Sequence, residues 1–460
     1  MTEAPTRTSA IIPDAVRVRS LPGGYLAAIL VISFLSGLLI YLDYQNLALV
    51  LALLCWTLIP LLWLTDRIAF DGRRIYRTGI VPRLVARAFG IRDRLKVSDI
   101  EQVETNVFPG IKRGRNIVYT YRTSVSGKTA RFVFSSGHRG YQAVIRSLLP
   151  RLSEDVLDIP SIDLRDHLVE RAELSKRAKE MDIPPSDVLD SSFRDIDLSG
   201  KNDGLSEDEA AERSQSLRKL ANELRVSGRL LSALEAFRRA AVLRPRDARL
   251  LFEFAACIRS VAGSESNKKL EHKALAMMRL AERHGKNDRD LLERIGETYF
   301  QIGEWQRAAI VFKWAADRFG DSFRTVRGKA ELALREGRLA HVVHNFANAY
   351  DLASTNSLRR WTKAEAEYFE HLNNDEEYME LEISRVNLLD TLERVKRTSL
   401  RTALVGFGVI GSGLFLEEYT VANTGWVVSG IGLAAWIVMI VMVRMLSARI
   451  PFDLVQESNE

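Results

Sequence analysis

The chain has 460 residues, of which 47% are hydrophobic and 27% charged, and its formal net charge is +6. This composition indicates a folded protein of several structural units and excludes an intrinsically disordered chain. Two cysteines are too few for a disulfide framework or a multi-cysteine metal site. The modest positive charge gives no reason to expect nucleic acid as a partner. Because apolar residues gather at both ends and charged residues in the middle, the chain combines membrane segments with ordinary soluble sequence.

Two apolar stretches near the N-terminus predict a transmembrane hairpin. Residues 25–42 and 47–64 contain no charge, and each is long enough to cross about 30 Å of hydrocarbon as a helix. The polar turn at 43–46 joins them. A cleaved signal peptide is the alternative, but the second span follows at once without a small-residue cleavage site. We therefore expect a cytoplasmic tail over 1–24 and a hairpin over 25–64.

A second apolar pair lies near the C-terminus. Residues 402–416 form a short, glycine-rich span and residues 426–443 a full-length one. The expected segments are a juxtamembrane helix, a second hairpin and a cytoplasmic tail, at 390–401, 402–443 and 444–460. The pairs Gly408/Ser412 and Gly430/Ala434 have the small-xxx-small spacing, which either brings helix backbones together in lipid or reflects the general frequency of glycine in such helices.

Positive charges next to the spans predict their orientation, because such loops are retained in the cytoplasm. The flanking cations are Arg17, Arg19, Arg67, Arg73, Arg74, Arg77, Lys396, Arg397, Arg401, Arg444 and Arg449. The short loops between the spans carry only Asp43, Glu417 and Glu418 as charges. We therefore expect a multi-pass protein of the bacterial inner (cytoplasmic) membrane, with both termini and the central domains in the cytoplasm. Few polar groups lie within the spans, so a transport path has little support.

The region after the first hairpin has strand character. Short stretches between residues 68 and 133 are separated by turns such as Asp71-Gly72, and an amphipathic helical pattern follows from Tyr141 to Leu149. The pattern predicts a small β-barrel or sandwich closed by one helix. With its FDGRRIYR and LKVSDIEQVE segments and the closing helix, the stretch 67–152 resembles bacterial pleckstrin-homology-like (PH-like) domains that follow a pair of membrane helices. The resemblance implies that fold but no common ligand.

Basic residues outnumber acidic ones by twelve to five between residues 67 and 115. A cluster of this kind beside a membrane either attracts anionic lipid headgroups or is the positive-inside signal alone. The lipid-facing candidates are Arg83, Arg87, Lys112, Arg113 and Arg115.

Residues 153–205 form an expected linker with one helix around 164–181. Its segment 195–204 is similar to a calcium-binding EF-hand loop, but the twelfth position is Ser206 rather than a bidentate glutamate. The better interpretation is a helix start, in which Ser206 and Glu209 form a capping box.

The clearest internal signal is a 34-residue repeat within 206–389. The residues that recur at this period are Gly303, Ala308, Phe312 and Ala315, then Gly337, Val342, Phe346 and Ala349. An earlier copy has Gly228 and Phe237, a second copy carries about seven extra residues in its turn, and a fifth unit begins near Leu358. Period and pattern resemble tetratricopeptide repeat (TPR) proteins, whose helical hairpins stack into a superhelix.

The TPR resemblance implies binding of a peptide or protein along a concave groove formed mainly by the first helix of each repeat. The groove candidates are Arg218, Asn222, Arg225, Glu293, Glu297, Arg327, Glu331 and Arg335. The alternative for each one is a solvated charge.

No P-loop, GxGxxG, HExxH or GxSxG motif is present, and His341 with His344 makes a weak metal case without a third ligand. We expect no catalytic, cofactor or metal residue. The predicted fold is a multi-domain α+β membrane protein with two transmembrane hairpins, a PH-like β domain and an α-solenoid of TPR hairpins. The expected function is a membrane scaffold that recruits a protein partner. The alternatives are a lipid or ligand sensor and an accessory subunit of a transport or secretion complex.

Overall fold

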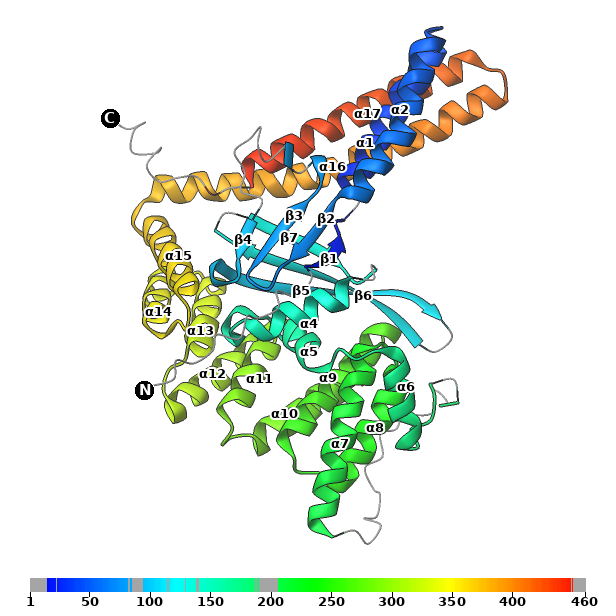
Figure 1. Ribbon diagram of the computed structural model, residues 1–460. Helices are drawn as coiled ribbons and strands as arrows, with labels where there is room; N and C mark the ends of the chain where they lie inside the picture. The colour runs from blue at the N-terminus through cyan, green and yellow to red at the C-terminus, as the bar shows by residue number, and fades with distance from the viewer. Residues whose placement is uncertain are drawn as a thin grey trace, which may run out of the picture. The chain divides into compact units, whose positions relative to one another are not determined.

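A computed structural model describes residues 15–21, 23–81, 83–84, 94–113, 116–128, 130–137, 140–186, 188–189, 206–447 and 449. Its internal contacts divide the chain into two compact units. Residues 1–21 and 64–364 form the sheet-and-array unit, and residues 22–63 and 365–460 form the apolar-helix unit. Each unit is described below by itself, with the element labels of Figure 1.

Two antiparallel sheets begin the sheet-and-array unit. The first has the strand order β1-β2-β3-β4, and its strands are β1 (Val16–Arg19), β2 (Arg67–Phe70), β3 (Arg74–Thr78) and β4 (Arg94–Lys96). The second contains β5 (Ile100–Arg113), β6 (Asn116–Gly127) and β7 (Ala130–Ser135). The turn between β2 and β3 forms because the Asp71 carboxylate accepts hydrogen bonds from the backbone N–H groups of Arg73 and Arg74. Strand β1 lies in the stretch expected to be a tail, and it pairs with β2 instead.

The sheets enclose a core that the strand pattern predicts. Val18 and Leu95 each lie between two exposed cations, and they are at most 2% exposed, as are Ile68, Phe70 and Ile75. The helix α4 (Tyr141–Leu148) packs Val144 and Leu148 into the same cluster. The expected strands and the amphipathic helix after them are therefore present, while the likeness to PH-like domains stays a prediction.

The expected linker is largely folded. The short 3-10 helix η2 (Leu149–Arg151) precedes it, and its described part contains the 3-10 helix η3 (Glu154–Val156), then α5 (Ile159–His167) and α6 (Arg171–Glu180). The single helix expected over 164–181 is wrong, because Leu168 and Glu170 have extended backbone and separate two helices. Asp158 caps α5 by accepting a hydrogen bond from the Ser161 N–H. The calcium-like stretch 195–204 lies outside the described residues.

An array of helical hairpins follows. Its helices are α7 (Glu207–Val226), α8 (Leu230–Leu243), α9 (Ala248–Glu265), α10 (Lys268–His284), α11 (Arg289–Gln301), α12 (Trp305–Phe319), α13 (Phe323–Arg335), α14 (Leu339–Leu352) and α15 (Asn356–Asn374). The predicted capping box of Ser206 and Glu209 begins α7. Gly228, Gly303 and Gly337 have φ of +85°, +87° and +72° in the turns, a conformation that glycine adopts without steric cost.

The second repeat differs from its expectation. Its extra residues do not form a long turn, because α9 continues through Glu265 and only Ser266 and Asn267 separate it from α10. Ser266 takes a left-handed conformation with φ of 52°, and the Asn267 side chain accepts hydrogen bonds from the first N–H groups of α10. The insertion therefore lengthens a helix and keeps the hairpin tight.

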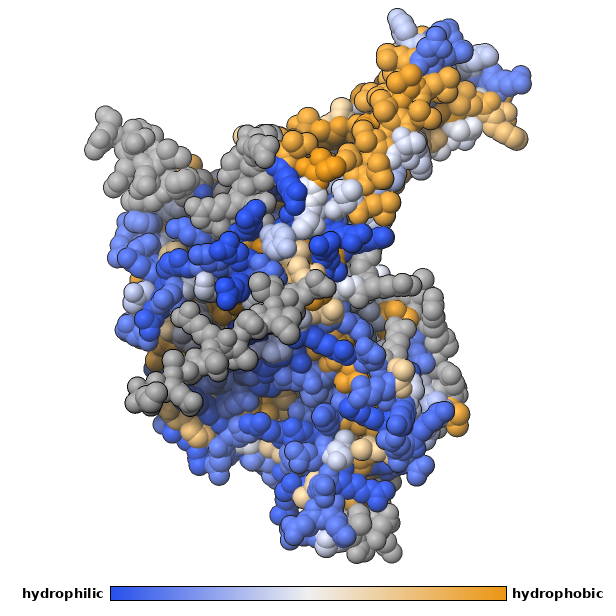
Figure 2. All heavy atoms as spheres, viewed as in Figure 1, coloured by the Kyte–Doolittle hydropathy of each residue, from blue (hydrophilic) through white to orange (hydrophobic). Residues whose placement is uncertain are grey.

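The apolar-helix unit contains four helices that are long and apolar enough to cross a membrane: α1 (Gly23–Tyr41), α2 (Gln45–Thr65), α16 (Glu376–Phe415) and α17 (Tyr419–Leu446). On the face that Figure 2 shows, their surface is the main hydrophobic area. α16 is continuous over 40 residues. It therefore joins the expected end of the array, the juxtamembrane helix and the third span into one element.

Small residues bring α16 and α17 together, but Gly408 and Gly430 are not among them, which favours the alternative that these two glycines reflect the general frequency of glycine in such helices. A Cβ on Gly408 would meet nothing within 4 Å, and one on Gly430 would meet only Phe34. The seam consists of Ala403, Gly406, Ile410 and Gly413 on α16 and Ala422, Gly425, Ser429 and Gly432 on α17. Small residues three, four and seven apart thus form this helix contact.

Candidate functional site

The inner face of the array is covered by other parts of the same unit. The first helices of the repeats, α7, α9, α11 and α13, contact α5, η3 or the β5–β6 hairpin. The core cluster of the sheets continues into the array through Val226, Phe323 and Val326. Sheets and array are therefore one folded body, and the groove expected to be open is partly filled by the chain itself.

The first repeat meets strand β6 at its turn. The Ile117 N–H donates to the Gly228 carbonyl over 3.1 Å, and the Tyr121 hydroxyl donates to the Val226 carbonyl over 2.6 Å. A Cβ on Gly228 would lie 1.8 Å from the Ile117 carbonyl oxygen. Glycine at this turn is thus required both by its backbone conformation and by the close approach of β6.

An ion pair attaches α5 to the first repeat. The Arg225 guanidinium lies 2.9 Å from the Asp163 carboxylate, and the two side chains are 12% and 28% exposed. Arg218 lies 3.0 Å from Glu253 on α9, and the Asn222 amide also donates to Glu253. Three of the predicted groove residues therefore hold the chain's own elements together.

The far end of the array has a similar attachment. The Arg324 guanidinium donates to the Glu154 carbonyl of η3 over 2.9 Å, and Arg294 lies 3.6 Å from the Glu154 carboxylate. The Ser357 hydroxyl donates to the Ile100 carbonyl at the start of β5 over 2.9 Å. The sheets are thus attached to the array at both of its ends.

A cavity of about 360 Å³ remains between the β5–β6 hairpin, α5 and the helices α7, α9 and α11. We call it the hairpin cavity. Its lining includes Val107, Tyr119, Tyr121, Pro160, Asp163, Arg225, Phe252, Glu253, Arg259, Ser260, Gly263, Ser264, Thr298 and Gln301. Gly263 is exposed, so the cavity reaches the surface along α9. Its size and its mixture of apolar wall and polar groups suit a side chain or a short segment of a partner.

The charged side chains that line the hairpin cavity include three in ion pairs and, within the described part of the chain, one cation outside any ion pair. Arg225 faces Asp163, and Glu253 faces Arg218, whereas Arg259 has no ion-pair partner among the residues that the structure describes. Burial lowers the pKa of the Arg259 guanidinium, and the positive charge of Arg225 lowers it further. Burial also raises the pKa of the Glu253 carboxyl, and Arg218 opposes that rise. A partner that brings a carboxylate would neutralise the remaining cation.

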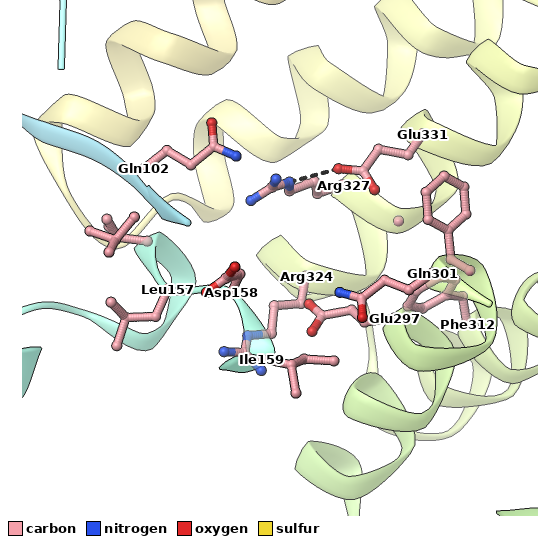
Figure 3. A pocket seen from close by; sticks show the side chains of 14 residues that line it. Gln102, Leu157, Asp158, Ile159, Glu297, Gln301, Phe312, Arg324, Arg327 and Glu331 are labelled. Carbon is pink, nitrogen blue, oxygen red and sulfur yellow. Dashed lines mark hydrogen bonds and ion pairs between the residues drawn. The ribbon is translucent and has the colours of Figure 1, made fainter. Parts of the chain in front are cut away.

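A smaller cavity of about 160 Å³ lies farther along the inner face (Figure 3). Arg324, Asp158, Glu297 and Gln301 point into it, and Arg327 with Glu331, 2.9 Å apart, forms one side. The Nη1 atom of Arg324 is buried without a hydrogen-bond partner among the described residues. Burial raises the pKa of Glu297. The lining of this space is about half polar, and its volume is that of a few water molecules.

The predicted groove residues are thus distributed over several environments. Arg225 lines the hairpin cavity, and Glu297, Arg327 and Glu331 line the smaller one. Glu293 accepts hydrogen bonds from Arg289 and the Ser322 hydroxyl. Arg335 lies apart from them and stacks on Trp305, with 3.7 Å from its guanidinium carbon to the ring centre.

The lipid-facing candidates are only partly described. Arg83 is exposed. Lys112 and Arg113 lie at the end of β5. Arg87 and Arg115 lie outside the described residues. His341 and His344 lie on α14, exposed, and in the described part of the chain no group of three or more His, Cys, Asp or Glu side chains could hold a metal ion.

Sequence reasoning missed the residue that matters most in the hairpin cavity. Arg259 stands 34 residues after Arg225, which is the period of the array, so the same offset argument could have identified it. The irregular turn of the second repeat obscured that equivalence. Arg324, Asp163 and Glu154 had no comparable signal, because their roles depend on contacts between distant segments.

No protein family model and no curated protein matches the sequence. Among solved structures, a thermophilic TPR protein of Thermus thermophilus, TTC0263, is 23% identical over 34% of this chain and 84% of that chain, with a TM-score of 0.29. The Cut9–Hcn1 hetero-tetramer of APC/C is 12% identical over 64% of this chain and 52% of that chain, with a TM-score of 0.28. Neither score is high enough to carry a conclusion about function from those proteins to this chain.

Proposed function

We propose that this protein is a membrane-anchored scaffold whose helical array recruits a protein partner at the cytoplasmic face of the membrane. The observation that carries the proposal is the pairing of four apolar helices with a repeat array that retains a partly charged cavity on its inner face. The partner supplies a short segment with a carboxylate, which pairs with Arg259 in the hairpin cavity.

Membrane anchoring is supported by the length and composition of α1, α2, α16 and α17. Large apolar side chains on them are exposed, for example Leu53 at 67% and Val405 at 65%. Such surface is unfavourable in water and favourable in hydrocarbon. The short connections carry Asp43, Glu417 and Glu418, whereas cations flank the other ends of the helices, which favours a cytoplasmic position for the array.

Recruitment through the hairpin cavity is supported by its architecture. The cavity is bounded by three repeat helices and by a β hairpin that is held by two hydrogen bonds to backbone carbonyls of the first repeat, one from the Ile117 N–H and one from the Tyr121 hydroxyl. A preformed site of this kind lowers the ordering cost of binding an extended segment. Anchoring would also raise the local concentration of the array for clients on the same membrane.

The test uses the full-length protein in its native membrane, with a photo-crosslinking amino acid in place of Ser264 at the edge of the cavity. We expect a defined crosslinked protein, and Arg259→Glu should abolish the adduct by reversing the unpaired charge. Lys313→Glu, an equal charge change on an exposed position of α12, is the matched control and should leave it intact. Arg218 and Arg225 are unsuitable for this test because both hold internal ion pairs. Equal adducts in the two variants would refute recruitment through this cavity.

A further inference from the structure

The first sheet has two chemically different faces. On its inner side Val18, Ile68, Phe70, Ile75 and Leu95 belong to the hydrophobic core, and Arg77, opposite Ile68, pairs with the buried Asp66. Its outward positions carry six exposed cations, which are Arg17, Arg19, Arg67, Arg74, Arg94 and Lys96. We call this surface the basic sheet face.

The strand register places these cations in adjacent rows. A row consists of the residues that lie directly opposite one another on neighbouring strands. Arg19 and Arg67 share one row, and Arg74 and Lys96 share another. The row between them contains Arg17, Ala69, Tyr76 and Arg94. Directly opposed residues in antiparallel strands have side chains on the same side. None of the outward positions on these four described strands holds an Asp or a Glu. The face therefore concentrates positive charge, and like-charged neighbours gain from an external anion.

Chain connections tie this face to the apolar helices. β1 ends at Arg19 and α1 begins at Gly23, while α2 ends at Thr65 and β2 begins at Arg67. Along β3, the step from Thr78, opposite Arg67, to Arg74 covers roughly 13 Å at about 3.3 Å per residue. Arg67 follows the end of α2 by two residues and therefore lies within about one Debye length of it, ~8 Å at physiological salt, whereas the pair of Arg74 and Lys96 lies roughly 13 Å farther along the sheet.

The positive-inside rule does not account for the whole face. Its influence is counted within about 15–20 residues of a span, whereas Arg94 and Lys96 follow the end of α2 at Thr65 by 29 and 31 residues. Strand pairing brings them beside Arg74. The fold therefore brings together cations that the orientation of the apolar helices in a membrane does not require.

We propose that the basic sheet face binds anionic lipid headgroups of the membrane that holds α1 and α2. This inference rests on the proposed membrane anchoring. Guanidinium groups donate several hydrogen bonds in a planar fork that fits phosphate oxygens. The two short connections to α1 and α2 tether the sheet to the bilayer that would hold these helices, which makes the lipid surface the occupant favoured over a soluble polyanion.

The test uses the full-length protein in vesicles of phosphatidylcholine with increasing fractions of phosphatidylglycerol. A photo-crosslinking phenylalanine analogue replaces Tyr76 at the centre of the face, and mass spectrometry quantifies lipid adducts. We expect adducts to rise with the phosphatidylglycerol fraction and to fall with salt. The double substitution Arg94→Gln and Lys96→Gln should lower them by roughly tenfold or more, since each cation near a charged surface is worth about fivefold.

The matched control is Arg122→Gln with Lys128→Gln, an equal loss of charge at exposed positions of the second sheet and its turn. It should leave the adducts unchanged, and equal thermal unfolding midpoints of the two double variants exclude loss of folding. Adducts that do not depend on phosphatidylglycerol, that fall equally in both variants, or that form mainly with protein or nucleic acid would overturn the proposal. Retention of the protein in the vesicles after alkaline extraction separates this result from a failure of anchoring.

Discussion

Arg225 of the first repeat and Asp163 of α5 form an ion pair 2.9 Å long across the inner face of the array. The two residues are 62 positions apart and belong to segments that the sequence suggests are independent, a linker and a repeat. Their pairing, with the contacts of Gly228 and Arg324, turns the sheets and the array into one unit. The surface that a partner can reach on the inner face of the array is therefore the part that α5, η3 and the β5–β6 hairpin leave uncovered.

Breaking that pair should destabilise the sheet-and-array unit. Arg225→Ala leaves the Asp163 carboxylate without its partner in a site where less than a third of its side chain is exposed, so we expect a loss of about 3 kcal/mol in the free energy of unfolding. Urea unfolding of the detergent-solubilised protein, followed by helical circular dichroism, measures it. Lys176→Ala, which removes an ion pair with exposures of 80% and 59%, should change the value by less than about 1 kcal/mol. Similar losses in both variants would show that Arg225 does not attach α5 to the array.

The seam between α16 and α17 predicts a sharp contrast between neighbouring glycines. A Cβ on Gly406 would lie 2.3 Å from the Ser429 hydroxyl oxygen, whereas one on Gly408 would meet nothing within 4 Å. Gly406→Leu should therefore separate the two helices at a cost of about 1–3 kcal/mol, and Gly408→Leu should be tolerated. Disulfide crosslinking between cysteines placed at Ala403 and Ser429, which are in contact and already carry a Cβ, reports the seam. Equal crosslinking yields in both leucine variants would mean that the helices pack in another register.

Asp158 gives the unit a distinctive pH dependence. Burial raises the pKa of its carboxyl from 3.8 to about 6, against the hydrogen bonds from Ser161 and Thr105. Between about pH 4 and pH 6 the unfolded chain loses this proton while the folded chain keeps it, so stability falls as the pH rises, by up to about 3 kcal/mol. Asp158→Asn lacks this loss. The free energy of unfolding should therefore fall with rising pH in the wild-type protein more than in Asp158→Asn. Parallel pH dependences of the two proteins would contradict a raised pKa of Asp158.

The sequence predicts the helical parts of the fold well because their signals are local. Periodic small and aromatic residues, turn glycines and uncharged stretches each depend on neighbours within one hairpin, as the positive φ of Gly303 and Gly337 illustrates. Four helices of the required length and apolar character occur close to the expected spans.

Contacts between distant segments could not be predicted in the same way. Strand β1 has four residues and pairs with β2 across the whole first hairpin, at Arg19 and Arg67, so no local pattern marks it. The sequence left the role of Gly408 open because several small residues on α16 have the same spacing, and only packing selects Gly406 over Gly408. Asp163 and Glu154 gain their roles from α5 and η3 docking onto the array.

The most direct test of the account is the side of the membrane on which the array lies. Both native cysteines, Cys55 and Cys257, are at most 1% exposed, so single cysteines introduced at Asp43, Glu417 or Ser266 can be labelled against a low background. A membrane-impermeant thiol reagent added to intact cells should label the first two positions, and should label Ser266→Cys only after the membrane is opened. Labelling of Ser266→Cys from outside intact cells would contradict a scaffold that recruits its partner in the cytoplasm.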